Sequence, residues 1–125
     1  MSMIETPLMR GLERVLDLSA FRHQVIAANL ANVDTPGYRT RDVREFAGEI
    51  EQAMAGDEPS FAEPSFTPVA HEIRGLMERP DGNNVSVDRE SLLLAQNQLR
   101  FTVAVAFLKE QFHQISSAIN RGSGS

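Results

Sequence analysis

Hydrophobic positions near the start of the chain recur at alternating spacings of three and four residues. This is the pattern of one apolar face on a helix that packs against another helix. Thr6 suits the N-cap, and Pro7 suits the first helical position, where its missing N–H costs nothing. We therefore predict an N-terminal helix over residues 6–33. Its seam comprises Met9, Leu12, Leu16, Ser19, His23, Ile26, Leu30 and Val33.

A longer seam with the same spacing occupies the end of the chain and predicts a second helix over residues 85–121. Asp88 is a good N-cap, and acidic Glu90 would lie in the first turn, where it complements the helix dipole. Two long helices joined by a shorter segment predict an all-α fold, a long antiparallel, coiled-coil-like hairpin that forms one domain over residues 1–125. The second seam comprises Val87, Ser91, Leu94, Gln98, Phe101, Val105, Leu108, Phe112, Ile115 and Ile119.

Several apolar residues of the C-terminal helix lie off this seam, so the helix is hydrophobic on more than one side. An isolated two-helix hairpin would leave them uncovered, which favours lateral neighbours in an assembly. The alternative is a second contact with the middle segment of the same chain. The off-seam residues are Leu92, Leu93, Leu99, Val103, Ala104 and Phe107.

The middle of the chain carries weaker signals. Asp42 and Glu45 fit a capping box that would open a short helix over residues 42–56. Residues 57–84 hold prolines 59, 64, 68 and 80 and show little periodicity, so we expect them to be extended or disordered before assembly, with 73–77 as the only anchor. The Gly-Ser repeat at 122–125 is expected to be a flexible tail.

The first helix should end in a tight turn over residues 34–41. In the segment Thr35-Pro36-Gly37-Tyr38, proline presets φ at the second turn position and glycine supplies the positive φ that a type II turn requires at the third. Pro36 also excludes Thr35 from the helix. Asn29 and Asn32 lie on one face just before this turn, where their amides can bond the free carbonyls of the last turn or a neighbouring chain.

Charge is distributed unevenly along the chain. The net charge is −5, yet residues 42–84 hold three basic and ten acidic groups, a net of −7, and both ends are nearly neutral. Neutral ends tolerate close packing with like chains. No basic stripe is present, so nucleic acid is not an expected partner. The longest apolar run, residues 103–108, is far shorter than the roughly 20 residues of a membrane span, so we do not expect an integral membrane protein.

Residue patterns typical of catalysis or metal binding are missing from the sequence. The three histidines, His23, His71 and His113, are more than 40 positions apart, and the chain has no cysteine. A metal site is therefore not expected, and no phosphate loop or nucleophile elbow occurs. We predict no enzymatic activity, no catalytic residues and no cofactor.

Two motifs resemble those of a known family. The pattern Ala28-Asn29-Leu30-Ala31-Asn32, followed by Thr35-Pro36-Gly37-Tyr38, is similar to the N-terminal signature of the bacterial flagellar axial proteins of the rod, hook and hook-associated structures. The downstream segment Asp81-Gly82-Asn83-Asn84-Val85, with residues 86–90 and 94–101, looks like the proximal rod type within that family. Together the two motifs extend the resemblance over nearly the whole chain.

The resemblance implies a mechanical function. It implies a structural subunit that assembles helically into the proximal rod of the flagellar basal body, transmits torque and forms the wall of the export channel. The implied partners are further copies of itself, neighbouring rod proteins, the ring-to-rod adapter protein and the export-gate proteins. The first residues lack the features of a secretory signal peptide, so the implied route to a periplasmic rod is flagellar type III export without a cleavable signal peptide.

Two other interpretations stay open. One is another flagellar rod subunit, against which the Asn83-Asn84-Val85 motif and the short middle segment argue. The other is a cytoplasmic helical secretion adaptor or chaperone. Antiparallel pairing of the two seams also predicts a register in which the polar residues His23 and Gln98 face each other, as a buried polar pair does in coiled coils.

Overall fold

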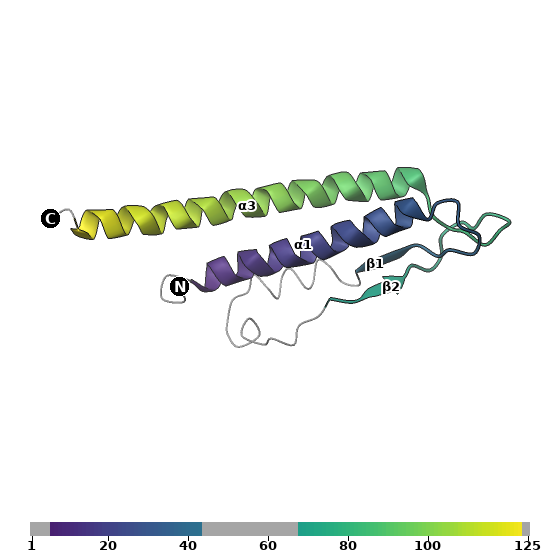
Figure 1. Ribbon diagram of the computed structural model, residues 1–125, viewed down its shortest axis with the longest axis horizontal. Helices are drawn as coiled ribbons and strands as arrows, with labels where there is room; N and C mark the ends of the chain where they lie inside the picture. Colours follow the sequence, from purple (N-terminus) through teal and green to yellow (C-terminus); the bar gives the residue numbers. More distant parts are fainter. Residues whose placement is uncertain (1–5, 44–67, 124–125) are drawn as a thin grey trace.

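Two antiparallel helices of unequal length form the body of the protein, as the computed structural model shows for residues 6–43 and 68–123 (Figure 1). Helix α1 spans Pro7–Ala31 and helix α3 spans Val87–Ser123, which gives 25 and 37 residues. They lie side by side, and α3 extends past the start of α1 (Figure 1). The predicted all-α hairpin is confirmed, although two short strands accompany it.

Helix α1 begins as its sequence predicts and ends at Ala31, two residues before the predicted end at residue 33. The Thr6 hydroxyl accepts a hydrogen bond from the Met9 amide at 3.1 Å, and Pro7 occupies the first helical position, which confirms Thr6 as N-cap. At the other end the Asn32 side chain donates to the Ala28 carbonyl at 2.8 Å and satisfies one of the free carbonyls of the last turn.

Helix α3 begins at Val87, two residues earlier than an N-cap at Asp88 would allow. The Ser86 hydroxyl accepts from the Arg89 amide at 3.2 Å, which is the N-cap bond, and the Ser86 carbonyl accepts from the Glu90 amide. The prediction of Asp88 as N-cap is therefore wrong. Asp88 and Glu90 both lie in the first turn, where their charge complements the helix dipole.

The strands β1 (Arg41–Val43) and β2 (Ala70–Glu72) form an antiparallel pair in which Asp42 lies opposite His71. They run along α1 on the side away from α3 (Figure 1). Asp42 therefore belongs to a strand and does not open the predicted helix over 42–56. The rest of that predicted helix, like residues 57–67 of the predicted extended segment, lies outside the described residues.

The predicted anchor at residues 73–77 is wrong for Met77, which is 91% exposed. Ile73 of the predicted anchor does hold the chain, since its amide donates to the Thr40 carbonyl, and residues 83–85, outside that anchor, are buried as well. Short stretches without periodicity can be fixed by backbone and amide hydrogen bonds, and a search for apolar periodicity does not detect these.

The apolar core is a thin layer centred on α1. Leu18 packs with Val43 of β1, and Val15 packs with Ala104 of α3, so α1 is covered on two sides. Helix α3 has fewer buried residues than α1, because only one face of α3 contacts α1. The buried hydrophobic residues are Met9, Leu12, Val15, Leu18, Ile26, Val43, Val85 and Ala104.

Candidate functional site

The turn after α1 has the predicted type II geometry. Gly37 has φ of 76°, and the Tyr38 amide donates to the Thr35 carbonyl at 3.1 Å, which is the bond between the fourth and first residues of the turn. The positive φ at the third position is the feature that glycine supplies. This turn sends the chain away from α1 and toward the loop that precedes α3.

That second loop, residues 79–86, has its own tight turn. The Gly82 amide donates to the Arg79 carbonyl at 2.8 Å, and Gly82 has φ of 86°. The Asp81 carboxylate accepts from the Asn83 amide at 3.0 Å, and the Asn83 carbonyl accepts from the Arg79 amide at 2.8 Å. Local polar bonds therefore shape this loop, and Val85 is its buried apolar residue.

The two loops interlock, although about 45 residues separate them in the sequence. The Gly37 amide donates to the Asp81 carbonyl at 2.9 Å, and the Asn84 amide donates to the Tyr38 carbonyl at 3.3 Å. A Cβ on Gly82 would lie 3.5 Å from the Gly37 Cα, an ordinary van der Waals distance, so the positive φ of the two residues, and not the space between them, favours glycine at both positions. We call this interlocked unit, residues 29–41 with 79–90, the clasp.

Asn83 joins the clasp to the end of α1. Its side-chain amide donates to the carbonyls of Asn32 at 2.9 Å and Thr35 at 2.8 Å, and its side-chain oxygen accepts from the Val85 amide at 2.8 Å. The residue is fully buried with every side-chain group paired. An asparagine is needed here because one short side chain must both donate twice and accept.

Asn29 likewise uses all of its side-chain donors and acceptors, from the α1 side of the clasp. Its amide donates to the Arg41 carbonyl at 2.8 Å and to the Glu90 carboxylate at 3.1 Å, while its oxygen accepts from the Tyr38 hydroxyl and the Arg41 amide. Glu90 is fully buried and also accepts from the Thr40 hydroxyl at 2.6 Å and from Arg89. A buried carboxylate is tolerated only when paired in this way.

A buried ion pair fixes the strands to α1. Arg22 donates from Nε and Nη2 to the two carboxylate oxygens of Asp42, each at 2.9 Å, and both residues are more than 90% buried. This two-point geometry sets the angle as well as the distance between the two groups. The pattern of apolar residues predicts no role for Arg22, and Asp42 pairs with it instead of opening the predicted helix.

The contact between the helices uses a face of α3 rotated from the predicted seam. Glu90, Asn97 and Ala104 are buried at intervals of seven, and the Asn97 amide donates to the Ser19 carbonyl at 2.8 Å. His23 and Gln98 are both exposed, so they are not the predicted buried polar pair. The prediction followed the most apolar positions, whereas the true contact includes a glutamate, an asparagine and a small alanine.

Of the predicted seam residues, the structure buries Met9, Leu12, Ser19 and Ile26, and leaves others at the edge or in solvent. Those half-buried are Leu16, Leu30, Val33, Leu94, Phe101, Val105, Leu108 and Ile115. Those exposed are His23, Val87, Ser91, Gln98, Phe112 and Ile119.

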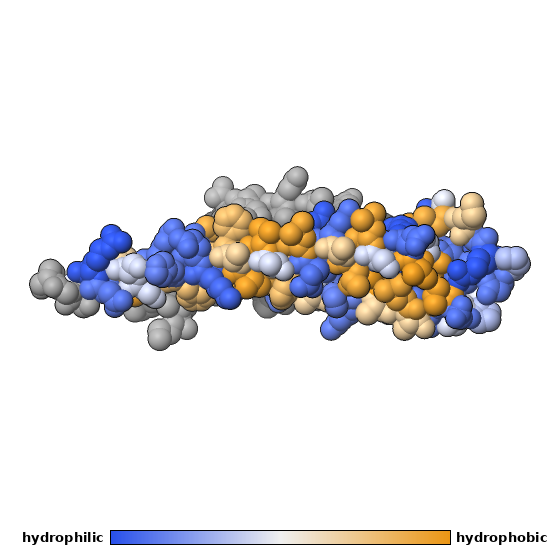
Figure 2. Space-filling view, turned by 90° about the horizontal axis from the view of Figure 1, so that it is seen from above, coloured by the Kyte–Doolittle hydropathy of each residue, from blue (hydrophilic) through white to orange (hydrophobic). Residues whose placement is uncertain are grey.

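An apolar stripe remains open to solvent on α3. Leu92, Leu99, Val103 and Phe107 recur at spacings of seven and four, and their exposed fractions range from 44% to 65%. Seen from the α3 side, hydrophobic surface continues along the hairpin in patches (Figure 2). Of the off-seam residues, Ala104 is buried against Val15 and Leu93 is half-buried, so the stripe is narrower than the predicted second face.

By length and composition alone, α3 could also cross a membrane, and 11% of its most apolar window is buried inside the protein. This leaves the expectation of a protein that is not membrane-integral as a prediction. The described residues contain no group of three or more His, Asp or Glu side chains that could hold a metal ion.

Comparison with known proteins connects the clasp with one family. A family model described as "Flagella basal body rod protein" matches residues 19–39, which cover the second half of α1 and the type II turn. The chain is similar to curated proteins named "Flagellar basal body rod protein FlgB". That of Escherichia coli (strain K12) is 30% identical over 131 residues, with 92% of this chain and 94% of the relative covered. That of Bacillus subtilis (strain 168) is 28% identical over 123 residues, with 90% and 93% covered.

Proposed function

From the premise that this chain belongs to the family of flagellar basal body rod proteins of the FlgB type, we propose that it is the proximal rod subunit, which assembles helically, transmits torque and forms part of the export channel wall. Membership makes it a structural subunit of the flagellar basal body rod. The finer role is supported by one observation above all, the apolar stripe of α3 that the hairpin leaves uncovered.

The stripe fits a subunit whose burial is completed by other subunits. Single exposed hydrophobic residues are normal on a protein surface. Here four large apolar side chains lie on one helical face, and such contiguous patches mark interaction sites. Rod-like assembly requires each subunit to use two different surfaces, since head-to-tail contacts with a screw rotation give an open array. The long, narrow hairpin offers such surfaces along its length (Figure 1).

The clasp supports the mechanical part of the proposal. The subunit can transmit torque only if the two helices are held at a fixed angle to each other and to the chain that enters the middle segment. The paired amides of Asn29 and Asn83 and the ion pair of Arg22 with Asp42 fix that angle through directional bonds. An apolar contact of the same area would resist sliding less, because it lacks direction.

Proposed partners follow from family membership. The chain assembles with other flagellar rod components, and within that setting we propose further copies of itself, the neighbouring rod proteins, the ring-to-rod adapter protein and the export-gate proteins as direct neighbours. It resides at the flagellar basal body. A periplasmic position reached by type III export without a cleavable signal peptide is part of the proposal, as is the lack of enzymatic activity.

A deletion strain tests the proposal. Loss of the gene should abolish swarming, and a tagged full-length copy should restore it and copurify with basal bodies stripped of membrane. A matched variant with Leu99→Ser should be expressed equally but fail to enter basal bodies. Restored motility with the tagged protein found only in the cytoplasm would favour the secretion adaptor and contradict a rod subunit.

A further inference from the structure

The end of α3 runs past the start of α1, and among the residues that the structure describes no helix lies beside it (Figure 1). Ala104 of α3 packs on Val15, and Val15 is eight residues from Pro7, where α1 begins. Because the two helices are antiparallel, α1 begins beside residue 112 of α3, eight residues after Ala104. We call residues 112–123 of α3 the overhang. At 1.5 Å per residue it is about 18 Å long.

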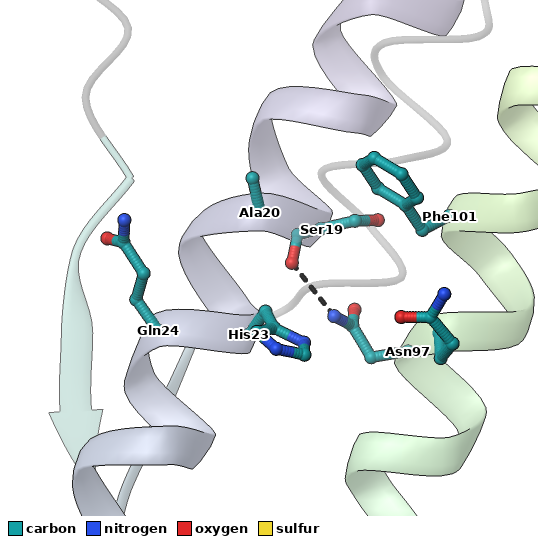
Figure 3. A pocket seen from close by; sticks show the side chains of 7 residues that line it. Ser19, Ala20, His23, Gln24, Asn97 and Phe101 are labelled. Carbon is teal, nitrogen blue, oxygen red and sulfur yellow. Dashed lines mark hydrogen bonds between the residues drawn. The ribbon is translucent and has the colours of Figure 1, made fainter.

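The overhang continues the face of α3 that contacts α1. Glu90 and Asn97 mark that face, and the Asn97 amide donates to the Ser19 carbonyl of α1 (Figure 3). Leu108 and Ile115 each follow one of them by 18 residues, which is five full turns at 3.6 residues per turn, so they lie on the same face. The overhang therefore carries, with no α1 opposite it, the side that α3 elsewhere turns toward α1.

Three large apolar side chains make this face of the overhang hydrophobic. Phe112 and Ile119 are 43% and 55% exposed, and Ile115 between them is half-buried. Their spacings of three and four residues keep them on one side of the helix. Contiguous exposed apolar side chains mark interaction sites, so we expect this face to be covered in the assembled protein.

The opposite end of the molecule presents an exposed apolar side chain of its own. Met77 directly precedes Glu78, which pairs with Arg39 of the clasp, so it belongs to the clasp end of the hairpin. Its side chain is 91% exposed. The Ile73 and Arg79 amides on either side of it are hydrogen-bonded, which fixes its position relative to the clasp. Methionine is flexible and polarizable, so it adapts to an irregular apolar surface.

Exposed charges at the two ends have opposite signs. The overhang contains Arg121 and His113 and no aspartate or glutamate. At the clasp end, Asp34 and Asp88 are exposed and form no ion pair among the described residues. Arg79, a nearby cation, donates instead to two backbone carbonyls. The free acidic groups of the clasp end therefore complement the basic overhang.

We propose that the overhang of one copy packs against the clasp end of the next. Met77 then covers Ile119, and Arg121 faces Asp34 and Asp88. The two surfaces lie at opposite ends of one elongated molecule (Figure 1), so all copies point the same way and each keeps one free end. The contact extends without closing. This inference rests on the proposed rod function and adds an end-to-end contact to the one proposed for the apolar stripe.

Crosslinking between differently tagged chains tests the contact, because the chain has no native cysteine. One full-length chain carries Met77→Cys and the other Ser116→Cys, which leaves the apolar side chains of the overhang intact, and both are coexpressed in the deletion strain. A short bis-maleimide added to purified basal bodies should yield the mixed dimer. The matched control replaces Ser116→Cys by Thr102→Cys, an exposed hydroxyl residue about 21 Å away along α3, and should give at least about tenfold less.

Charge reversal tests the ion pairs across the contact. Arg121→Glu should lower entry into basal bodies at least about fivefold, the equivalent of one exposed ion pair. Adding Asp34→Lys and Asp88→Lys to the same chain should restore entry. Lys109→Glu, just outside the overhang, is the matched control and should leave entry unchanged. All four positions are exposed, so the thermal midpoint of each single variant as a monomer should move by no more than about 4 °C.

The outcomes separate this contact from the function on which it rests. Basal bodies that contain both tagged chains without the mixed dimer, or a charge reversal without rescue, would overturn the end-to-end contact and leave the rod function intact. A dimer of the Ser116→Cys chain with a protein of different mass would overturn it equally, as would a crosslink within one chain that carries Ser2→Cys and Ser116→Cys. A wild-type chain missing from basal bodies would overturn the proposed function itself.

Discussion

The clasp and the shaft of the hairpin are held together in opposite ways. In the clasp, the side chains of Asn29, Asn83 and Glu90 are buried and paired. Along the shaft, by which we mean the rest of α1 and α3, α3 rests on α1 through a thin layer that includes Asn97 and Ala104, and several of its large hydrophobic residues are exposed. Directional bonds fix angles, and apolar surface supplies adhesion without direction. The comparison supports the proposal that the clasp fixes shape within one subunit and that the shaft adheres to others.

The largest expected effect comes from breaking the ion pair beside the clasp. Arg22→Met leaves the Asp42 carboxylate buried without its cation and should lower the free energy of unfolding by about 4 kcal/mol. Urea denaturation of the full chain measures it. The double variant with Asp42→Leu should recover much of this loss, and equal instability of the single and double variants would show that the ion pair does not hold the strands.

Asn29→Ala should have the next largest effect, about 3 kcal/mol, because it leaves Glu90 and the Arg41 backbone short of partners. Asn32→Ala is the matched control. Asn32 lies three residues on, and its side chain bonds the Ala28 carbonyl and the Thr35 hydroxyl in exposed positions. Similar losses for both variants would contradict the central position of Asn29 in the clasp.

Gly37→Val should cost about 2 kcal/mol, since a β-branched residue is strained at φ of 76° even though no atom lies within 4 Å of its Cβ position. Motility at equal expression and export checks the consequence, and the variant should impair rod formation more than Leu92→Ala does. Normal rods from the Gly37 variant would mean that the subunit tolerates a different turn.

The smallest expected effect on the monomer is that of Leu99→Ser. Leu99 is 65% exposed, so its replacement should change the free energy of unfolding by no more than about 0.5 kcal/mol. Assembly should nevertheless fail. A monomer that loses several times more stability would show that the stripe is covered within one chain, which would remove the contrast between clasp and shaft.

Amide exchange would sharpen the same comparison without any substitution. The bonded amides of Gly37 and Val85 in the clasp should exchange at least about 100-fold more slowly in dilute monomer than those around Ile119, where α3 runs past α1. Uniform protection along α3 would contradict the expectation that its far end is ordered by assembly.

The sequence by itself determined the two long helices, the N-cap at Thr6 and the turn at Gly37. These depend on local rules, namely a missing N–H, a positive φ and apolar periodicity, which act over a few residues. The resemblance of the two motifs to the flagellar axial family could also be recognised from the sequence, because each motif is a continuous segment of the chain.

Only the tertiary structure decided which faces meet and that the two motifs form one clasp. Asn83 bonds the end of α1 across some 50 positions, and Asp42 pairs with Arg22 instead of capping a helix. The observed contact between the helices contains Glu90 and Asn97. A search for apolar periodicity does not find these two residues, because both are polar. Polar partners are chosen by geometry in three dimensions, and we propose that the apolar face of α3 is left open for a neighbouring subunit.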